Sequence, residues 1–254
     1  MQRFRMAAAA AAMIAIASSS ALAVEIGARG AYWFPELSGD VQTTTAGVPE
    51  TLIDVKDTLG VEDENLPFGE AFLRAGRWTL RVGYSGIKFD GNKELSQTIM
   101  FNGETFSVAD DVVTRLEMKM LDGDLQCDIL RPDAGIVAFN LGLLLKVKYV
   151  DGEVELRSAA GGSTVQDFKA PVPMAGAAVG AGILKNMIRV DLRGAGIAYS
   201  GNHLYDVDAY ASFAPLPFVR LQGGYRYIDL RIDEDDIRAS LKMKGPYVGT
   251  QLSF

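Results

Sequence analysis

The feature that most constrains this chain is a strict two-residue alternation of side chains between Val137 and Tyr149. Every second residue from Val137 onward is a large apolar one, seven in all, whereas the residues between them include Asn140, Lys146 and Lys148. A β-strand places successive side chains on opposite faces, so one face of this strand is apolar throughout. Strands of soluble antiparallel sheets also alternate. Seven successive apolar residues on one face, however, favour a strand with lipid on its outer side and a polar interior on its inner side. Such a strand crosses a membrane with about 9–11 residues.

The same alternation recurs between turn residues along the rest of the chain. It predicts ten strands, at 24–34, 68–76, 78–90, 111–130, 134–150, 168–184, 187–200, 203–214, 218–232 and 237–254. Tight connections at 77, 131–133, 185–186 and 215–217 alternate with connections that are mostly longer and more polar. An even number of strands joined alternately by short turns and long loops is typical of membrane barrels. We therefore predict an all-β fold, a closed antiparallel transmembrane β-barrel of ten strands, with eight or twelve strands as alternatives.

The beginning of the chain predicts export. Arg3 and Arg5 precede an alanine-rich apolar stretch, 6–17, and 21–23 reads Ala-Leu-Ala, a small-x-small cleavage site. The apolar stretch is shorter than the about 20 residues that a membrane-spanning helix needs, although a retained anchor is an alternative. We expect a signal peptide, 1–23, cleaved near Ala23 and followed by a single barrel domain, 24–254.

Composition argues against several classes of site. The formal net charge is −7, whereas a surface that binds nucleic acid needs a cluster of basic residues. The chain has one histidine and one cysteine, too few for a zinc or haem motif or for an intramolecular disulfide. We therefore expect no cofactor, no metal site and no nucleic-acid partner.

Several segments resemble small, mostly uncharacterised outer-membrane β-barrel proteins of Gram-negative bacteria. The resemblance rests on residues 53–60, which contain the Asp-x-Leu-Gly pattern, on 66–68, on 77–84 with its Arg-x-x-Leu-Arg-x-x-Tyr pattern, and on 89–91. The final alternating strand, which ends in Phe254, also resembles the segment that the barrel-insertion machinery of such proteins reads. The resemblance implies a location in the outer membrane, contact with its lipid and lipopolysaccharide, and recognition of Phe254 by that machinery. It implies no particular activity.

The polar faces of the strands are expected to line the lumen. The predicted lumen-lining residues are Arg29, Arg74, Arg81, Asp122, Asp124, Lys146, Lys148, Arg189, Asp191, Arg193, Asp206, Asp208, Arg220, Arg226 and Lys242. A ten-stranded barrel is only a little wider than an eight-stranded one, whose interior side chains fill it. These charges therefore predict either an ion-paired, largely plugged lumen or a narrow passive channel for small solutes.

Two strands show a change of apolar phase. In the last strand, residues before Gly245-Pro246 and residues after it alternate out of step, which predicts a β-bulge at that dipeptide. The fourth strand shows a similar change at Met120-Leu121. On this interpretation the following residues of the last strand face lipid: Ile237, Ala239, Leu241 and Met243.

The long loops suggest further roles. Residues 50–59 form a short amphipathic run that is compatible with one or two helical turns. Its apolar side chains predict either a plug in the barrel mouth or a lid over the rim, formed by Leu52, Ile53, Val55 and Leu59. An Asn102-Gly103 turn predicts a hairpin in the second loop. Surface adhesion or binding through loops 35–67 and 91–110 is therefore an alternative function.

An enzymatic role would depend on His203. It lies close to Asp206 and Asp208 in the sequence, and a histidine beside a carboxylate is a candidate general base. Further catalytic groups could come from Ser200, Asp110, Asp111 and the acidic run 233–236. Omptin-type outer-membrane proteases use a His-Asp pair, but the residues around His203 match no omptin motif. We predict a non-enzymatic protein and keep a rim hydrolase as the weakest alternative.

Overall fold

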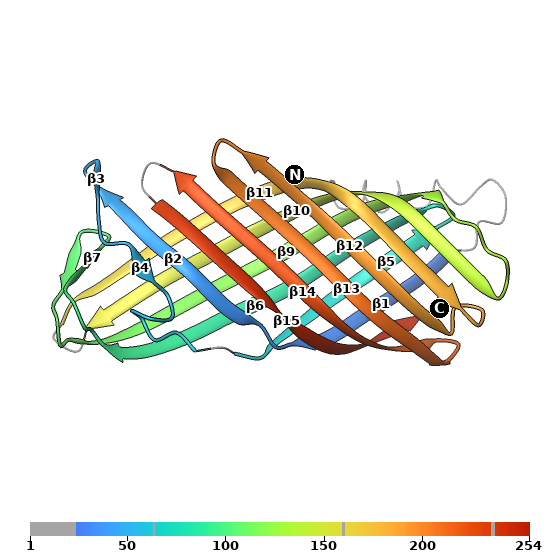
Figure 1. Ribbon diagram of the computed structural model, residues 1–254, viewed down its shortest axis with the longest axis horizontal. Helices are drawn as coiled ribbons and strands as arrows, with labels where there is room; N and C mark the ends of the chain where they lie inside the picture. The colour runs from blue at the N-terminus through green and yellow to red at the C-terminus, as the bar shows by residue number, and fades with distance from the viewer. Residues whose placement is uncertain (1–23, 63, 159–160, 235–236) are drawn as a thin grey trace, which may run out of the picture.

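The computed structural model describes residues 24–62, 64–158, 161–234 and 237–254. The predicted signal peptide, 1–23, lies outside these residues. Within them the chain forms antiparallel strands that close on themselves (Figure 1). No helix in the described ranges is long and apolar enough to cross a membrane.

The wall of the barrel has ten strand positions, as predicted. β1 (Val24–Trp33) and β2 (Glu36–Thr45) share the first position, because they pair in succession with the two halves of β15 (Ile237–Ser253). The other eight, in their order around the wall, are β5 (Leu66–Ala75), β6 (Trp78–Glu94), β9 (Asp111–Leu130), β10 (Val137–Ser158), β11 (Ser163–Ile183), β12 (Ile188–Tyr199), β13 (Asn202–Leu216) and β14 (Val219–Glu234). Four short strands belong to the loops: β3 (Val48–Pro49), β4 (Ile53–Asp54), β7 (Ile99–Phe101) and β8 (Glu104–Phe106).

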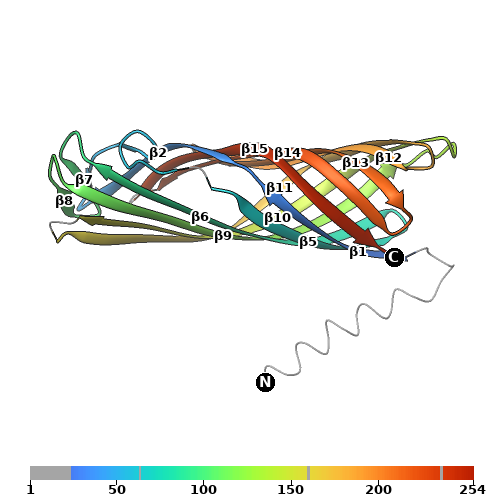
Figure 2. The same cartoon turned by 90° about the horizontal axis from the view of Figure 1, so that it is seen from below.

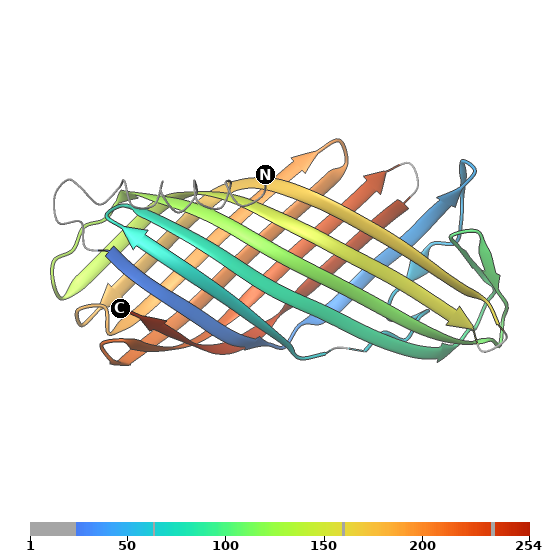
Figure 3. The same cartoon turned by 180° about the vertical axis from the view of Figure 1, so that it is seen from behind.

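The two ends of the barrel differ. The described chain starts and ends at the end where the connections are short, and the loop strands lie at the opposite end (Figures 1 and 2). Outer-membrane barrels have short periplasmic turns, so we call the first end periplasmic and the second extracellular. β9, β10 and β11 have 20, 22 and 21 residues, against 12 in β12. The long strands therefore project at the extracellular end, which is seen from behind in Figure 3.

An apolar band surrounds the periplasmic part of the barrel. On β10 the outward side chains Leu143 and Leu145 are 59% and 61% exposed, and Tyr149 ends the apolar series. The next outward residues are Asp151 and Glu153. Exposed leucines in this number need a lipid environment, so the band marks the membrane-crossing part of the wall.

The inner face changes from polar to apolar at the upper edge of this band. The change occurs between Lys148 and Val150 on β10, between Asp122 and Met120 on β9, between Arg226 and Ile228 on β14, and between Tyr247 and Met243 on β15. The outer face changes in the opposite sense at the same level, from Tyr149 to Asp151 and from Leu121 to Lys119. Below this level lipid surrounds the wall, so the charges lie inside. Above it water surrounds the wall, so the apolar side chains form a core inside.

The β-bulges expected at Gly245-Pro246 and Met120-Leu121 do not occur. The inversion of the two faces explains these changes of phase instead. Residues of β14 and β15 pair one to one through Tyr225↔Pro246 and Arg226↔Gly245, without a shift. The expected lipid-facing positions of β15 are therefore wrong, and its apolar residues there point into the extracellular core: Ala239, Leu241 and Met243. β6 and β9 likewise pair without a shift through Tyr84↔Leu121. Phase changes without a bulge mark the membrane boundary in both strands.

The predicted hairpin in the second loop is confirmed and packs into the extracellular core. β7 and β8 pair across the Asn102-Gly103 turn, whose residues have φ values of 50° and 81°. The side chains of Phe101 and Phe106 are at most 1% exposed. Glu50 holds the turn, because its carboxylate accepts a hydrogen bond of 2.8 Å from the Gly103 amide and another from the Thr43 hydroxyl. Burial acts to raise the pKa of Glu50, but these hydrogen bonds outweigh burial and lower it.

The first loop fills a gap in the wall between β2 and β6. Ile53 pairs with Val41 of β2, and Val61 bridges to Gly91 of β6. A side chain at position 91 would lie 2.6 Å from the Leu59 carbonyl oxygen, so this close approach requires glycine. The predicted plug or lid thus becomes part of the extracellular wall, with Ile53, Val55 and Leu59 buried. Leu52 is 55% exposed and does not take part in this packing.

Candidate functional site: the charge cluster in the lumen

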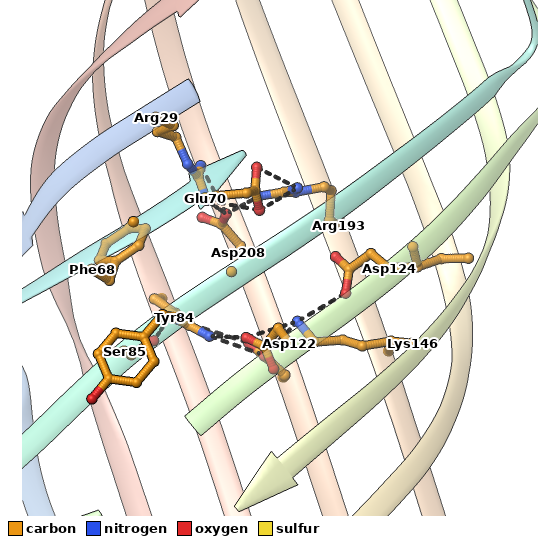
Figure 4. A pocket seen from close by; sticks show the side chains of 16 residues that line it. Arg29, Phe68, Glu70, Tyr84, Ser85, Asp122, Asp124, Lys146, Arg193 and Asp208 are labelled. Carbon is orange, nitrogen blue, oxygen red and sulfur yellow. Dashed lines mark hydrogen bonds and ion pairs between the residues drawn. The ribbon is translucent and has the colours of Figure 1, made fainter. Parts of the chain in front are cut away.

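Alternating residues of eight strands bring charged side chains together inside the membrane-crossing part of the barrel. We call the following residues the charge cluster, and Figure 4 draws all of them except Arg81 and Lys148: Arg29, Glu70, Arg81, Asp122, Asp124, Lys146, Lys148, Arg193, Asp206, Asp208 and Arg226. Most of them are buried against one another. Because buried charges are tolerated only when paired, the contacts within the cluster determine what it can do.

Asp206 is the centre of the half nearest the extracellular core. Its Oδ2 atom lies 2.8 Å from Lys146 Nζ, 3.0 Å from Lys148 Nζ and 3.1 Å from an Arg226 guanidinium nitrogen. Asp122 contacts the same cations, at 2.6 Å from Lys148 Nζ and 3.3 Å from Arg226. Two carboxylates therefore share three cations that come from β10 and β14.

Asp208 and Glu70 are the centre of the other half. Asp208 lies 2.8 Å from Arg193 and 3.1 Å from Arg29, and it accepts a hydrogen bond of 2.7 Å from the Tyr247 hydroxyl. Glu70 lies 3.2 Å from Arg193 and 3.6 Å from Arg29. These pairs join β1, β5, β12 and β13 across the lumen, so they hold opposite sides of the wall together.

Aromatic rings separate the charge cluster from the extracellular core. The Arg226 guanidinium lies 5.5 Å from the Trp33 ring and 5.4 Å from the Phe68 ring. The Arg29 guanidinium lies 5.2 Å from the Phe68 ring, and Phe68 packs edge-on against Tyr247 at 5.3 Å. Cation–π contacts of this kind are favourable in desolvated places. The rings thus contact the arginine guanidinium groups of the charge cluster on one side and the apolar side chains of the extracellular core on the other.

The charge cluster leaves little free space. It contains six cations and five carboxylates, and the cavity between them is ≈30 Å³. Two buried cationic atoms, Arg29 Nε and Arg81 Nη1, have no hydrogen-bond partner among the described residues. A cavity of this size holds a water molecule or two, which would supply such partners. Chemically the cluster is a self-neutralising ionic network.

A wider vestibule lies on the periplasmic side of the charge cluster. Its cavity of ≈260 Å³ is lined by residues that include Arg74, Arg189, Asp191 and Arg220. Arg189 is held by Asp191 at 2.8 Å and by the Asn140 side chain at 2.7 Å. A side chain at Gly180 would lie 2.2–2.5 Å from these groups, so the small residue there provides room for the arginine.

The predicted lumen-lining residues divide into three groups. Most lie in the charge cluster, and Arg74, Arg189, Asp191 and Arg220 lie in the vestibule. The prediction for Lys242 is wrong: its side chain is 51% exposed on the outer face of β15, 3.9 Å from Asp229. A bulge at Gly245-Pro246 would turn Lys242 inward, and β15 has none there. The predicted lumen-lining residues are all charged and therefore do not include Tyr247, which lies on the inner phase of β15 and contacts Asp208.

His203 lies outside the charge cluster. Its ring is tilted against Tyr205 at 5.1 Å, and its Nε2 atom lies 3.2 Å from Asp229 Oδ1. The expected partners Asp206 and Asp208 instead face the lumen and pair with cations, so the expected general-base pairs with them are wrong. Asp229 follows His203 by 26 residues, and only the register of β13 and β14 brings the two together.

The end of the chain closes the barrel on the periplasmic side. The Phe254 amide donates a hydrogen bond of 2.9 Å to the Ile26 carbonyl oxygen, and the Ile26 amide donates one of 3.0 Å to the Phe254 carbonyl oxygen. The Phe254 ring is 81% exposed and stacks on Phe218 with 6.3 Å between ring centroids. The Phe254 side chain therefore lies on the outer surface of the barrel.

Comparison with known proteins identifies the fold. No family model and no curated protein matches the sequence. The outer membrane protease OmpT from Escherichia coli is similar in structure, with a TM-score of 0.55 and 11% identity over 93% of this chain and 100% of that chain. The chain has the fold of an outer-membrane β-barrel. At this identity the likeness concerns the fold of the barrel alone.

Two further outer-membrane proteins align with the barrel more loosely. The attachment invasion locus protein Ail of Yersinia pestis has a TM-score of 0.37 at 11% identity, over 91% of this chain and 99% of that chain. Neisserial surface protein A has a TM-score of 0.33 at 12% identity, over 91% of this chain and 97% of that chain.

Proposed function

We propose that the protein is a closed, non-conducting and non-enzymatic barrel of the Gram-negative outer membrane, and that it acts through its extracellular end. The observation that carries this proposal is the charge cluster, whose direct ion pairs cross the lumen and leave ≈30 Å³ between them. The aromatic rings and the apolar extracellular core lie beyond it, and both disfavour a path for hydrated ions.

The shape of the extracellular end supports a role in surface contact. β9, β10 and β11 extend beyond the apolar band, and their outward charges form exposed pairs such as Arg115 with Asp90 at 3.3 Å and Lys169 with Asp151 at 3.1 Å. Packing of β7 and β8 into the core makes this projection rigid. Exposed apolar side chains on its loops are those of Val48, Leu52, Met100 and Val108. A rigid surface with exposed apolar groups suits binding of another macromolecule.

The surroundings of His203 support a non-enzymatic role. Its carboxylate partner, Asp229, also accepts a hydrogen bond of 2.7 Å from the Tyr227 hydroxyl. The carboxylates next along β13, Asp206 and Asp208, are held by cations inside the lumen. The histidine thus lacks Asp206 and Asp208, the partners on which the rim-hydrolase alternative relied. We further propose lipid and lipopolysaccharide as partners of the apolar band, and Phe254 as the residue recognised during insertion.

Single-channel recording tests the closed lumen. The mature chain, 24–254, refolded and shown to be folded by its heat-modifiable migration, is expected to give no stable current steps in a planar bilayer. The matched variant combines Arg29→Ala, Arg193→Ala and Asp208→Ala, three of the side chains in the half that is centred on Asp208 and Glu70. Current steps from this variant and not from the wild type would show that the charge cluster, and not the extracellular core alone, closes the lumen. Stable, ion-selective steps from the wild-type chain would contradict the proposal. They would favour the narrow channel, whose selectivity a charge reversal at Lys146 should then shift.

A further inference from the structure

The wall has a gap between β11 and β12 at the extracellular end. The two strands pair from Ile183↔Ile188 up to Ala175↔Gly196, and there the ladder stops. Beyond that pair, residues 166–174 of β11 have no strand partner on this edge within the described part of the chain. Pro171 and Pro173 lie in this stretch and lack an N–H to donate, as is common on edge strands. Figure 3 shows the β12–β13 hairpin diverging from β11.

The gap opens into an apolar pocket of ≈390 Å³. This volume is in the range of small-molecule sites. Ile197 and Tyr199 share the inward phase of Arg193 and Ala195, yet they are 37% and 80% exposed because no strand covers them there. The apolar lining comes from five strands, β10 to β14, through Val150, Phe168, Ala170, Val172, Ile197, Leu204, Leu230 and Ile232.

The pocket lies at the level where the membrane ends. Tyr149, the last apolar outward residue of β10, pairs with Pro171, and the next pair, Val150↔Ala170, contributes to the pocket. Below the gap, a shallow groove of ≈370 Å³ runs on the outer surface of the apolar band. Small residues, among them Gly194 and Gly196, form its floor. The groove and the pocket share Ile197, so an apolar surface continues from the lipid side into the wall.

Polar groups stand at the extracellular rim of the pocket. Asn202, His203 and Arg231 line it there, and Arg231 is exposed. We propose that one acyl chain of an outer-leaflet lipid passes along the groove and occupies this pocket, with an anionic headgroup beside Arg231. A chain that moves from hydrocarbon into the pocket stays out of water, whereas an empty apolar pocket exposes its lining to water. The position of the gap at the lipid boundary favours a membrane lipid over a solute from outside.

Retention of lipid by the refolded chain tests this proposal. The mature chain is reconstituted with palmitoyl-oleoyl phosphatidylglycerol, extracted into detergent, and examined by native mass spectrometry. The wild-type barrel is expected to retain one phosphatidylglycerol. Ala170→Trp fills the pocket and is expected to abolish retention. The matched control is Ala181→Trp, on the lipid-facing side of the same strand and below the gap, which is expected to retain the lipid.

A second measurement covers the case in which Ala170→Trp does not fold. Tyr199→Trp places a fluorescent side chain at the exposed edge of the pocket. Phosphatidylglycerol with brominated chains is expected to quench this tryptophan beyond the quenching of the parent protein. A folded wild-type barrel that retains no lipid would overturn the proposal. Equal retention in Ala170→Trp and the wild type, or unquenched fluorescence in Tyr199→Trp, would also overturn it.

Discussion

Asp206→Asn is expected to lower the free energy of unfolding by about 3–5 kcal/mol. Asp206 is the shared partner of Lys146, Lys148 and Arg226, at 2.8–3.1 Å. Its neutralisation leaves three buried cations opposite Asp122 and raises the net charge of the charge cluster from +1 to +2. The measurement is denaturant unfolding of the refolded barrel in lipid vesicles, followed by tryptophan fluorescence and heat-modifiable migration.

Two comparisons make the Asp206 result specific. Asp151→Asn breaks an exposed pair with Lys169 and is expected to cost at most about 1 kcal/mol. Adding Lys146→Met to Asp206→Asn removes one unpaired cation and is expected to restore part of the lost stability. Equal stability of Asp206→Asn and Asp151→Asn would show that the charge cluster does not hold the lumen together.

Leu241→Lys is expected to cost at least about 3 kcal/mol or to prevent refolding. Leu241 is 1% exposed in the extracellular core, where it pairs with Gly39 and Leu230. The core offers a buried ammonium group apolar neighbours in place of a carboxylate, so the charge would be desolvated without compensation. The measurement is the yield of heat-modifiable barrel, followed by unfolding in vesicles.

The neighbouring residue provides the control for Leu241→Lys. Lys242 points outward, so Lys242→Leu is expected to change stability by at most about 0.5 kcal/mol. If β15 contained a bulge at Gly245-Pro246, the two positions would exchange faces and the two variants would exchange their effects. A tolerated Leu241→Lys beside a damaging Lys242→Leu would therefore contradict the continuous register.

Alternation together with the lengths of the connections predicts the ten-stranded fold, with eight or twelve strands as alternatives. The apolar face of Val137 to Tyr149 requires lipid on one side, and the short connections at 131–133, 185–186 and 215–217 mark the periplasmic turns that the structure contains. The strand ends were less predictable. β10 continues to Ser158, because above Tyr149 the outward residues turn polar while the ladder with β9 and β11 goes on.

The inversion of the two faces could not be separated from a bulge by inspection of single strands. Both produce an apolar series that changes phase, as around Gly245-Pro246. Only the pairing of neighbouring strands shows that no residue is inserted. A sequence signal was nevertheless present, because Lys242 and Lys244 take the outer phase at the point where Leu241 and Met243 take the inner one. A charged series that replaces an apolar one on the same face indicates a change of surroundings.

The sequence predicts which residues belong to the charge cluster, but it does not predict which of them contact one another. Inward charges follow from the polar phase of each strand, which placed Asp122, Lys146 and Asp206 in the lumen. Which of them pair depends on strand tilt and stagger, which set what lies across the barrel. For this reason the partners of Arg29 and the contact between His203 and Asp229 follow only from the register of the closed wall.

β15 crosses the membrane boundary in one register while its surroundings change from lipid to water. Single cysteines along β15, in a Cys127→Ser background and in lipid vesicles, test this with a water-soluble maleimide. We predict labelling at 240, 242 and 244, protection in the core at 239, 241 and 243, and protection in lipid at 248, 250 and 252. A lipid-soluble maleimide should label the last three positions. Labelling at 239, 241 and 243, with protection at 240, 242 and 244, would contradict the account.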